Sequence, residues 1–258
     1  MLTNDNYFSP ENNRQYMSVS QFKSFEKCPA CALAMLNGQY TPDTTTALLV
    51  GSYVDAYFEG TLDIFKAHHP MLFKRDGTLK ADYLAADNII ARVERDPLFM
   101  AYMSGEKQVI MTGEIEGVPV KIKVDSLHED KIVDLKCMRD FSPIYREGQG
   151  RLHWVEAWGY DLQGAVYQEI VRQNTGKQLP FYLAAVTKEK EPDLSVIEVN
   201  QAYLDFQLAH FRRNVQRYDA MKQGLIEPER CERCDYCRST KVLTAPVSLE
   251  EMIGDDTN

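Results

Sequence analysis

Three ionisable residues near the middle of the chain have the types and spacing of a metal-assisted hydrolytic site. Asp125 lies in an apolar segment, and the triplet Asp134-Leu135-Lys136 begins nine residues later. Alternate side chains of a strand share a face, so Asp134 and Lys136 are expected on one side and Leu135 on the other. Two carboxylates beside an amine favour a divalent cation that activates water against a phosphodiester. The alternative is a solvated ion pair on an exposed strand.

The next predicted helix carries a polar and aromatic face. Gln163 and Tyr167 are four positions apart, so their side chains project from the same side, and Tyr160 is close to them. This face is not typical of a core. It therefore strengthens the hydrolytic interpretation of the two aspartates and the lysine.

A second constellation consists of cysteines. Cys231, Cys234 and Cys237 repeat at intervals of three residues, which lets three thiolates face one centre, as in the leading part of a ferredoxin run. A fourth ligand is required, and Cys28 is available. The alternative is a zinc site that pairs Cys28 and Cys31 with Cys231 and Cys234 and leaves Cys237 unused.

The apolar periodicity predicts the elements that must position these residues. Alternation within 107–137, interrupted near 116–117 and 128–130, predicts three consecutive strands that form a meander. Other ranges predict helices at 18–36 (interrupted at Pro29), 44–58, 80–95, 153–172 and 202–222, and strands at 179–187 and 194–199. This order predicts an α/β fold with a mixed central sheet flanked by helices on both faces.

Composition excludes several classes of protein. The 258 residues include 38 acidic and 29 basic side chains, so the net charge of −9 excludes a general nucleic-acid coat but not a local basic groove. The sequence has no long apolar run, secretory signal or phosphate-binding loop, which argues against a membrane protein and an ATPase. We therefore expect a cytoplasmic location and no membrane partner. Both tryptophans, Trp154 and Trp158, are expected in the core.

The order Asp125, Asp134-x-Lys136, Gln163-x-x-x-Tyr167 on strand, strand and helix resembles the PD-(D/E)XK nuclease superfamily, especially its RecB-like branch. The segment from 113 to 136 is also similar to phage exonucleases of the RecE-like or lambda-exonuclease kind. The match spans most of the chain. It implies a restriction-endonuclease-like core at 107–199 within a single nuclease-like domain covering 1–258.

The resemblance also implies roles for the central residues. Asp125, Asp134 and the Leu135 carbonyl would bind Mg²⁺ or Mn²⁺, and Lys136 would orient the attacking water. The resemblance makes DNA the substrate and the chain an exonuclease of phage or bacterial recombination or repair, with a single-strand annealing protein as a partner. Lambda-type relatives form rings, so an oligomer is compatible with the resemblance.

Three further residues take their roles from the same resemblance. Gln163 and Tyr167 would support the site or the DNA strand. Asp55 stands where many relatives carry a histidine, and an acid there could bind a second metal ion. Glu114 is a weaker candidate ligand, because a glutamate near a hairpin is usually solvated.

The cysteines resemble those of RecB-like nucleases that hold a 4Fe-4S cluster. In that group one cysteine precedes the core and three follow it. The implied ligands are Cys28, in the helical segment 18–36, and Cys231, Cys234 and Cys237, in the loop 228–240. Besides the exonuclease, two functions stay open: a CRISPR-associated type of iron-sulfur nuclease, and an inactive nuclease fold that only binds nucleic acid.

Overall fold

The structure is a computed structural model that describes residues 2–146, 148–246 and 248–249. Its helices are α1 (Pro10–Gln15), α2 (Val19–Lys27), α3 (Pro29–Leu36), α4 (Thr46–Phe58), α5 (Leu62–His68), the 3-10 helix η1 (Pro70–Leu72), α6 (Ala81–Glu94), α7 (Pro97–Tyr102), α8 (Trp154–Ala157), α9 (Tyr160–Thr175), α10 (Gln201–Lys222) and α11 (Asp235–Ser239). Its strands are β1 (Glu106–Ile115), β2 (Val118–Leu127), β3 (Ile132–Met138), β4 (Ile144–Arg146), β5 (Gly150–Leu152), β6 (Phe181–Thr187) and β7 (Leu194–Glu198).

The central sheet is mixed, with the strand order β1-β2-β3-β6-β7. The first three strands form the predicted antiparallel meander, β3 pairs with β6 in parallel, and β6 pairs with β7 antiparallel. The parallel pair requires a crossover, which α8 and α9 provide. The predicted α/β fold with a mixed sheet is confirmed.

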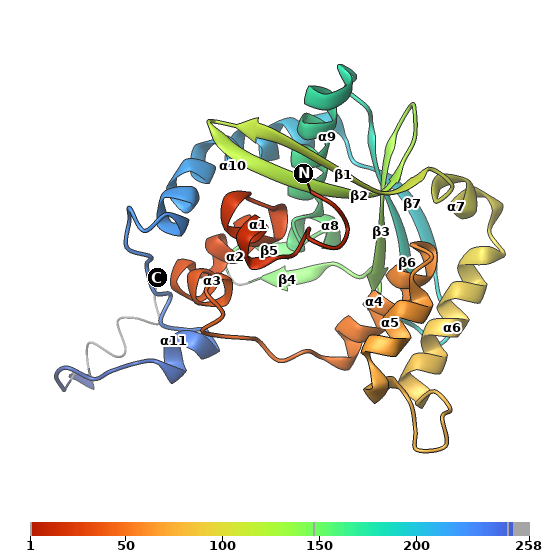
Figure 1. Cartoon of the computed structure of the whole chain (residues 1–258), viewed down its shortest axis with the longest axis horizontal. Coiled ribbons are helices and arrows are strands. Elements are labelled where there is room, and N and C mark those ends of the chain that lie inside the picture. Colours follow the sequence, from red (N-terminus) through yellow and green to blue (C-terminus); the bar gives the residue numbers. More distant parts are fainter. Residues whose placement is uncertain (1, 147, 247, 250–258) are drawn as a thin grey trace.

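Helices cover both faces of this sheet (Figure 1). On one face, α2, α9 and α10 pack over β2 around residues such as Phe22, Val166 and Phe211. On the other face, α4 and α6 enclose a second core that contains Tyr53 and Leu135. Leu135 is therefore in the core, as alternation predicts, while its neighbours on β3 face the other way.

Strands β2 and β3 pair over only a short stretch and then diverge. Their paired residues are Ser126 with Val133 and Leu127 with Ile132. Beyond this point the Leu135 N–H donates to the Asp125 carboxylate at 2.9 Å instead of to a backbone carbonyl. The edge of β2 that β3 leaves is covered by Met17, whose N–H and carbonyl bond to the backbone of Pro119 and Lys121. The divergence opens space between two strands beside the aspartates.

The crossover between β3 and β6 differs from the prediction. The helix expected at 153–172 is split into α8 and α9 by Gly159, which has a φ of 61°. A short hairpin, β4 with β5, precedes it and was not predicted. In the described part of the chain, no helix is long and apolar enough to cross a membrane.

Candidate active site

The acidic residues of β2 and β3 meet where these strands diverge. Asp125 accepts hydrogen bonds from the Leu135 N–H at 2.9 Å and from the Gln108 amide at 3.4 Å. Asp134 lies on the neighbouring strand and is almost completely buried, with 1% of its surface exposed. Both carboxylates line a single cavity of about 240 Å³ together with Lys136 and Asp55.

The predicted Asp134 and Lys136 pair is present on one face of β3. The Lys136 ammonium forms an ion pair with Asp134 Oδ2, and the Gln163 amide donates to Asp134 Oδ1 at 2.6 Å. Oδ2 is buried, and among the described residues its charged partner is Lys136 alone. This oxygen therefore has capacity for a further electropositive partner, which is the chemistry a hard divalent cation requires.

The cavity brings three carboxylates close to one another among four lysines, and the pKa values reflect this crowding. Burial and the nearby Asp125 raise the pKa of Asp134, although Lys136 acts in the opposite direction. Burial lowers the pKa of Lys136, but the carboxylates of Asp134 and Asp125 outweigh burial and raise it. Lys136 thus remains an ammonium at neutral pH. A bound divalent cation would offset the remaining repulsion between the carboxylates.

Asp55 reaches the same cavity from α4. Thr45 caps this helix, and the burial of Tyr53 and Val54 against the second core fixes its rotation. Burial, followed by repulsion from Asp125, raises the pKa of Asp55 to about 8. Asp55 is therefore part of the acidic cluster, a proximity between α4 and the strands that spacing along the chain cannot predict.

Of the two residues predicted from the helical face, only one contacts the carboxylates. Gln163 holds Asp134, whereas the Tyr167 hydroxyl donates to the Lys123 carbonyl at 3.1 Å. Tyr167 thereby fixes β2 two residues before Asp125. Both residues line the cavity, so the i, i+4 spacing identified neighbours with different contacts.

Sequence reasoning missed several residues of this site, among them Lys23 and Gln108. Lys23 lines the cavity from α2, where a capping box between Ser18 and Gln21 starts the helix and buried Phe22 anchors it. Burial, then the charge of Lys136, lowers the pKa of Lys23 to about 8. Gln108 faces Asp125 from β1 with a left-handed φ of 53°, a strained conformation for a non-glycine residue. No local sequence signal indicates either position.

The wall of the cavity near the start of the chain is aromatic and basic. Tyr7 and Phe8 line it, and the Lys121 ammonium bonds to the Tyr7 carbonyl. Lys123 lies over the rings of both aromatic residues, 5.9 Å from the centroid of Tyr7 and 5.3 Å from that of Phe8. Glu114, the weaker candidate ligand, is exposed on β1 and does not line this cavity.

The cysteines form a second cluster between the two ends of the chain. Cys28 Sγ lies 3.5 Å from Cys237 Sγ, and Cys231 Sγ lies 3.9 Å from Cys237 Sγ. With Cys234, these sulfurs all lie within 4.8 Å of one another. Within the described ranges no other set of three or more His, Cys, Asp or Glu residues is so compact. The three carboxylates of the cavity are therefore more widely spaced than the thiols.

The backbone around these cysteines favours a thiolate at Cys231, whereas burial raises the pKa of Cys28 to about 12 and that of Cys234 to about 11. The Cys234 N–H donates to Cys231 Sγ at 3.3 Å, and the Cys237 N–H donates to Cys234 Sγ at 3.4 Å. Burial raises the pKa of Cys231, but such backbone donors outweigh burial and lower it to about 6. Cys31 lies outside the compact set of four and packs against its edge. The cluster could hold a metal.

Comparisons with known proteins agree with this architecture. A family model described as a PDDEXK-like domain of unknown function (DUF3799) matches residues 18–240. A crystal structure described as a "putative exonuclease" from Eubacterium rectale has a TM-score of 0.94 and 49% identity, and the alignment covers 98% of each chain. A search among curated proteins finds no match. Because the family model covers most of the sequence, the chain belongs to the family of PDDEXK-like domains.

Proposed function

We propose that this protein is a metal-dependent nuclease that hydrolyses phosphodiester bonds at DNA ends. The observation that carries the proposal is the convergence of Asp125, Asp134 and Lys136 on one cavity, where the two carboxylates lie close together. The family and the description of the Eubacterium rectale protein support a nuclease in general. An inactive fold would have no need to keep mutually repelling carboxylates together.

The residues present fit a bound Mg²⁺ or Mn²⁺ ion. Asp125, Asp134 and the Leu135 carbonyl would hold it, since all three offer the hard oxygen ligands these ions prefer. The ion, when bound, neutralises phosphate charge and lowers the pKa of a water molecule. Asp55 adds a carboxylate that could support a second ion.

The protein's own side chains would orient the reaction. Lys136 stays protonated, so it would act as a hydrogen-bond donor that positions the attacking water and stabilises charge, and not as the general base. Gln163 holds the Asp134 carboxylate in one orientation. Lys23 would add positive charge for the phosphate.

The test is cleavage of end-labelled linear DNA in a series of divalent cations. We expect degradation of linear DNA with Mg²⁺ or Mn²⁺ and none without added cation. A closed circular DNA of the same sequence is the matched substrate, and it should resist. If Lys136→Ala degrades linear DNA as fast as the parent protein, the assignment of the site is wrong.

We further propose that Cys28, Cys231, Cys234 and Cys237 hold a metal centre. The resemblance to iron-sulfur nucleases supports a 4Fe-4S cluster. The thiol separations of 3.5 and 3.9 Å support a zinc ion, because four thiolates at about 2.3 Å from one ion lie about 3.8 Å apart. Iron with absorbance near 400 nm in an anaerobic preparation would identify the cluster, and one zinc per chain would identify the ion.

We infer the biological role from the resemblance to phage exonucleases. A nuclease that resects DNA ends in recombination or repair produces single strands, which a single-strand annealing protein would receive. Co-purification of such a protein with this chain would support this role, and failure of the two proteins to co-purify would count against it.

A further inference from the structure

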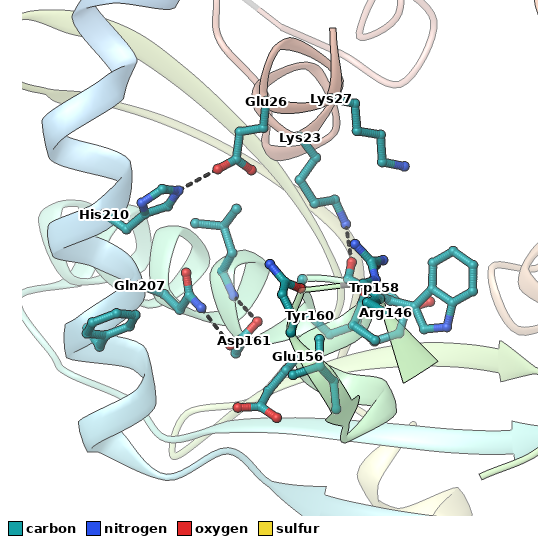
Figure 2. A pocket seen from close by; sticks show the side chains of 16 residues that line it. Lys23, Glu26, Lys27, Arg146, Glu156, Trp158, Tyr160, Asp161, Gln207 and His210 are labelled. Atoms are coloured by element: carbon teal, nitrogen blue, oxygen red, sulfur yellow. Dashed lines mark hydrogen bonds and ion pairs between the residues drawn. The ribbon is translucent and has the colours of Figure 1, made fainter. Parts of the chain in front are cut away.

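A second pocket adjoins the catalytic cavity and has no role in the proposed hydrolysis (Figure 2). Its volume is about 560 Å³. Four parts of the fold line it: helix α2, the β4–β5 hairpin, the turn between α8 and α9, and helix α10. A volume of this size is within the range of pockets that hold small organic ligands.

Two side chains connect this pocket to the catalytic residues. Lys23 lines both the pocket and the catalytic cavity. The ring of Tyr160 lines the pocket, and the ammonium groups of Lys136 and Lys23 lie 4.9 and 5.4 Å from its centroid. A polymer whose phosphate reaches Lys136 would therefore pass directly into the pocket.

The rim of the pocket exposes a tryptophan. Trp154 is buried in the core as predicted, but the same prediction is wrong for Trp158, which is 48% exposed. The reason is the break at Gly159, whose positive φ turns the chain between α8 and α9. Exposing so large an apolar ring costs hydration free energy unless a ligand covers it.

The turn that carries Trp158 is firmly held. The Lys23 ammonium donates to the Trp158 carbonyl at 2.9 Å, and the Arg146 guanidinium donates to the Ala157 carbonyl, as Figure 2 shows for Lys23. At Gly159 a Cβ atom would lie 3.1 Å from Lys23 Cδ, so a larger residue would disturb this packing. The indole is thus presented by a preorganised turn.

The charges in the pocket are suited to a phosphate backbone. Two of its three acidic groups are engaged within the pocket: Glu26 pairs with His210, and Asp161 accepts hydrogen bonds from Gln207 and from the Leu162 N–H (Figure 2). The third, Glu156, is exposed and accepts from the His153 N–H at 3.3 Å. Lys27 and Arg146 line the pocket and are exposed, and neither forms an ion pair with any residue that the structure describes. Because Arg146 already donates to the Ala157 carbonyl, Lys27 is the cation that this pocket offers to a phosphate.

We propose that this pocket binds the single-stranded DNA segment next to the phosphate that is cleaved, with a base stacked on Trp158 and the backbone near Lys27. The inference rests on the proposed nuclease function and specifies its substrate. A base must be unpaired to present its face to an indole, and stacking on aromatic side chains is the common mode of single-strand binding. The pocket is too small for a duplex.

Intrinsic fluorescence provides a direct test, because the chain has only two tryptophans and Trp154 is buried. The measurement uses the Asp134→Asn variant, in which the oligonucleotide stays intact. Oligo(dT) should quench the fluorescence emission of the exposed Trp158 and leave that of the buried Trp154 unchanged. Trp158→Phe should remove the quenching but keep the affinity. Quenching that persists in Trp158→Phe would overturn the proposal.

Affinity measurements test the energetic contribution. Trp158→Ala should weaken oligo(dT) binding by about tenfold, within the range for loss of one stacked base. Leu98→Ala, which truncates an exposed side chain on α7, is the control and should have no effect. Equal weakening for oligo(dT) and a blunt duplex would contradict the single-strand assignment, as would no weakening at all.

The charge contribution has its own measurement. Lys27→Ala should reduce the slope of log affinity against log salt by about 0.7, the value for one phosphate contact on a single strand. Lys74→Ala, on the loop after η1, should leave the slope unchanged. An unchanged slope in Lys27→Ala would remove this residue from the DNA path.

These results separate the two proposals. If the parent protein cleaves linear DNA but Trp158→Ala binds oligo(dT) normally, the pocket assignment fails and the nuclease function stands. If no cation supports cleavage but the quenching and the tenfold loss are observed, the nuclease function fails and the binding site stands.

Discussion

The catalytic cavity and the cysteine cluster are built in opposite ways. Asp125, Asp134 and Lys136 come from two neighbouring strands that pair just beyond them, so these residues meet through local structure. The cysteine cluster joins Cys28 to Cys237, and the Ala30 N–H donates to the Glu229 carbonyl beside it. The first site places like charges together at a cost in stability. The second closes the two ends of the fold.

From this difference we expect the catalytic cavity to carry out the chemistry and the cysteine cluster to stabilise the fold. Repulsion among buried carboxylates destabilises the folded chain until a cation binds. A metal held by four thiolates, in contrast, contributes folding free energy outright. Mutations at the two sites should therefore separate activity from stability.

The largest expected effect is on cleavage. Asp134→Asn keeps the shape and the contact with Gln163 but removes a metal ligand, so the rate of DNA cleavage should fall by about 10³-fold or more, as for loss of a metal ion's charge stabilisation. The melting temperature should not fall. Glu114→Gln makes the same change at an exposed site on β1 and should cleave normally. Normal cleavage by Asp134→Asn would contradict the assignment of catalysis to the cavity and of stability to the cysteine cluster.

The second largest effect is on stability. Cys237→Ser should release the metal and lower the melting temperature by about 10 °C or more, because structural metal sites contribute several kcal/mol and each kcal/mol shifts the melting temperature by about 2–4 °C in a chain of this size. Calorimetry and elemental analysis measure both. Cys31→Ser lies outside the compact set and should retain the metal. If Cys31→Ser loses metal as readily as Cys237→Ser, Cys31 is also a ligand and the set of four is wrong.

A smaller effect concerns pH and cations. The pKa of Asp55 is raised to about 8 by burial and by Asp125, against 3.8 unfolded, so its ionisation favours the unfolded chain. Without added divalent cation, the free energy of unfolding should decline as pH rises from about 4 to about 8 and then level off. Denaturant titrations at several pH values measure this decline.

Two comparisons sharpen the pH prediction. In Asp55→Asn the free energy of unfolding should decline less steeply with pH than in the parent protein. If the two proteins declined with the same slope, the raised pKa of Asp55 would be contradicted. Adding Mg²⁺ at about 100 times its Kd should stabilise the parent protein at pH 9 by about 2.7 kcal/mol. The same addition should stabilise Asp134→Asn much less.

The smallest effect distinguishes the two residues of the α9 face. Gln163→Ala leaves Asp134 without its amide donor and should lower the cleavage rate by about tenfold, in line with about 1.5 kcal/mol for a hydrogen bond to a charged group. Tyr167→Phe removes the contact with the Lys123 carbonyl and should cost about 1 kcal/mol in stability with little change in rate. Equal rates for the two variants would show that neither positions the carboxylate.

The alternation of apolar and polar residues was sufficient to predict the strands of the meander and part of the catalytic cavity. Alternation predicted the meander, and it predicted that Asp134 and Lys136 share a face while Leu135 enters the core, which the ion pair and the burial of Leu135 confirm. Helical spacing grouped Gln163 with Tyr167. It did not predict that the Tyr167 hydroxyl bonds to backbone, since that depends on how α9 lies on β2.

Other features required the folded chain. Lys23 enters the cavity because α2 packs on α10 through stacked rings of Phe22 and Phe211, a contact with no local signature. The exposure of Trp158 depends on a left-handed turn at Gly159, and glycine alone does not specify that conformation.

Residue types and spacing were enough to identify the available chemistry: two acids and an amine at strand spacing, and thiols at intervals that can surround one metal. Tertiary structure alone decided which distant groups share a site, namely Asp55 and Lys23 with the strands, and Cys28 with the last three cysteines. The physical reason is that spacing along a chain fixes direction only within one element. Proximity between elements depends on the packing of the whole core.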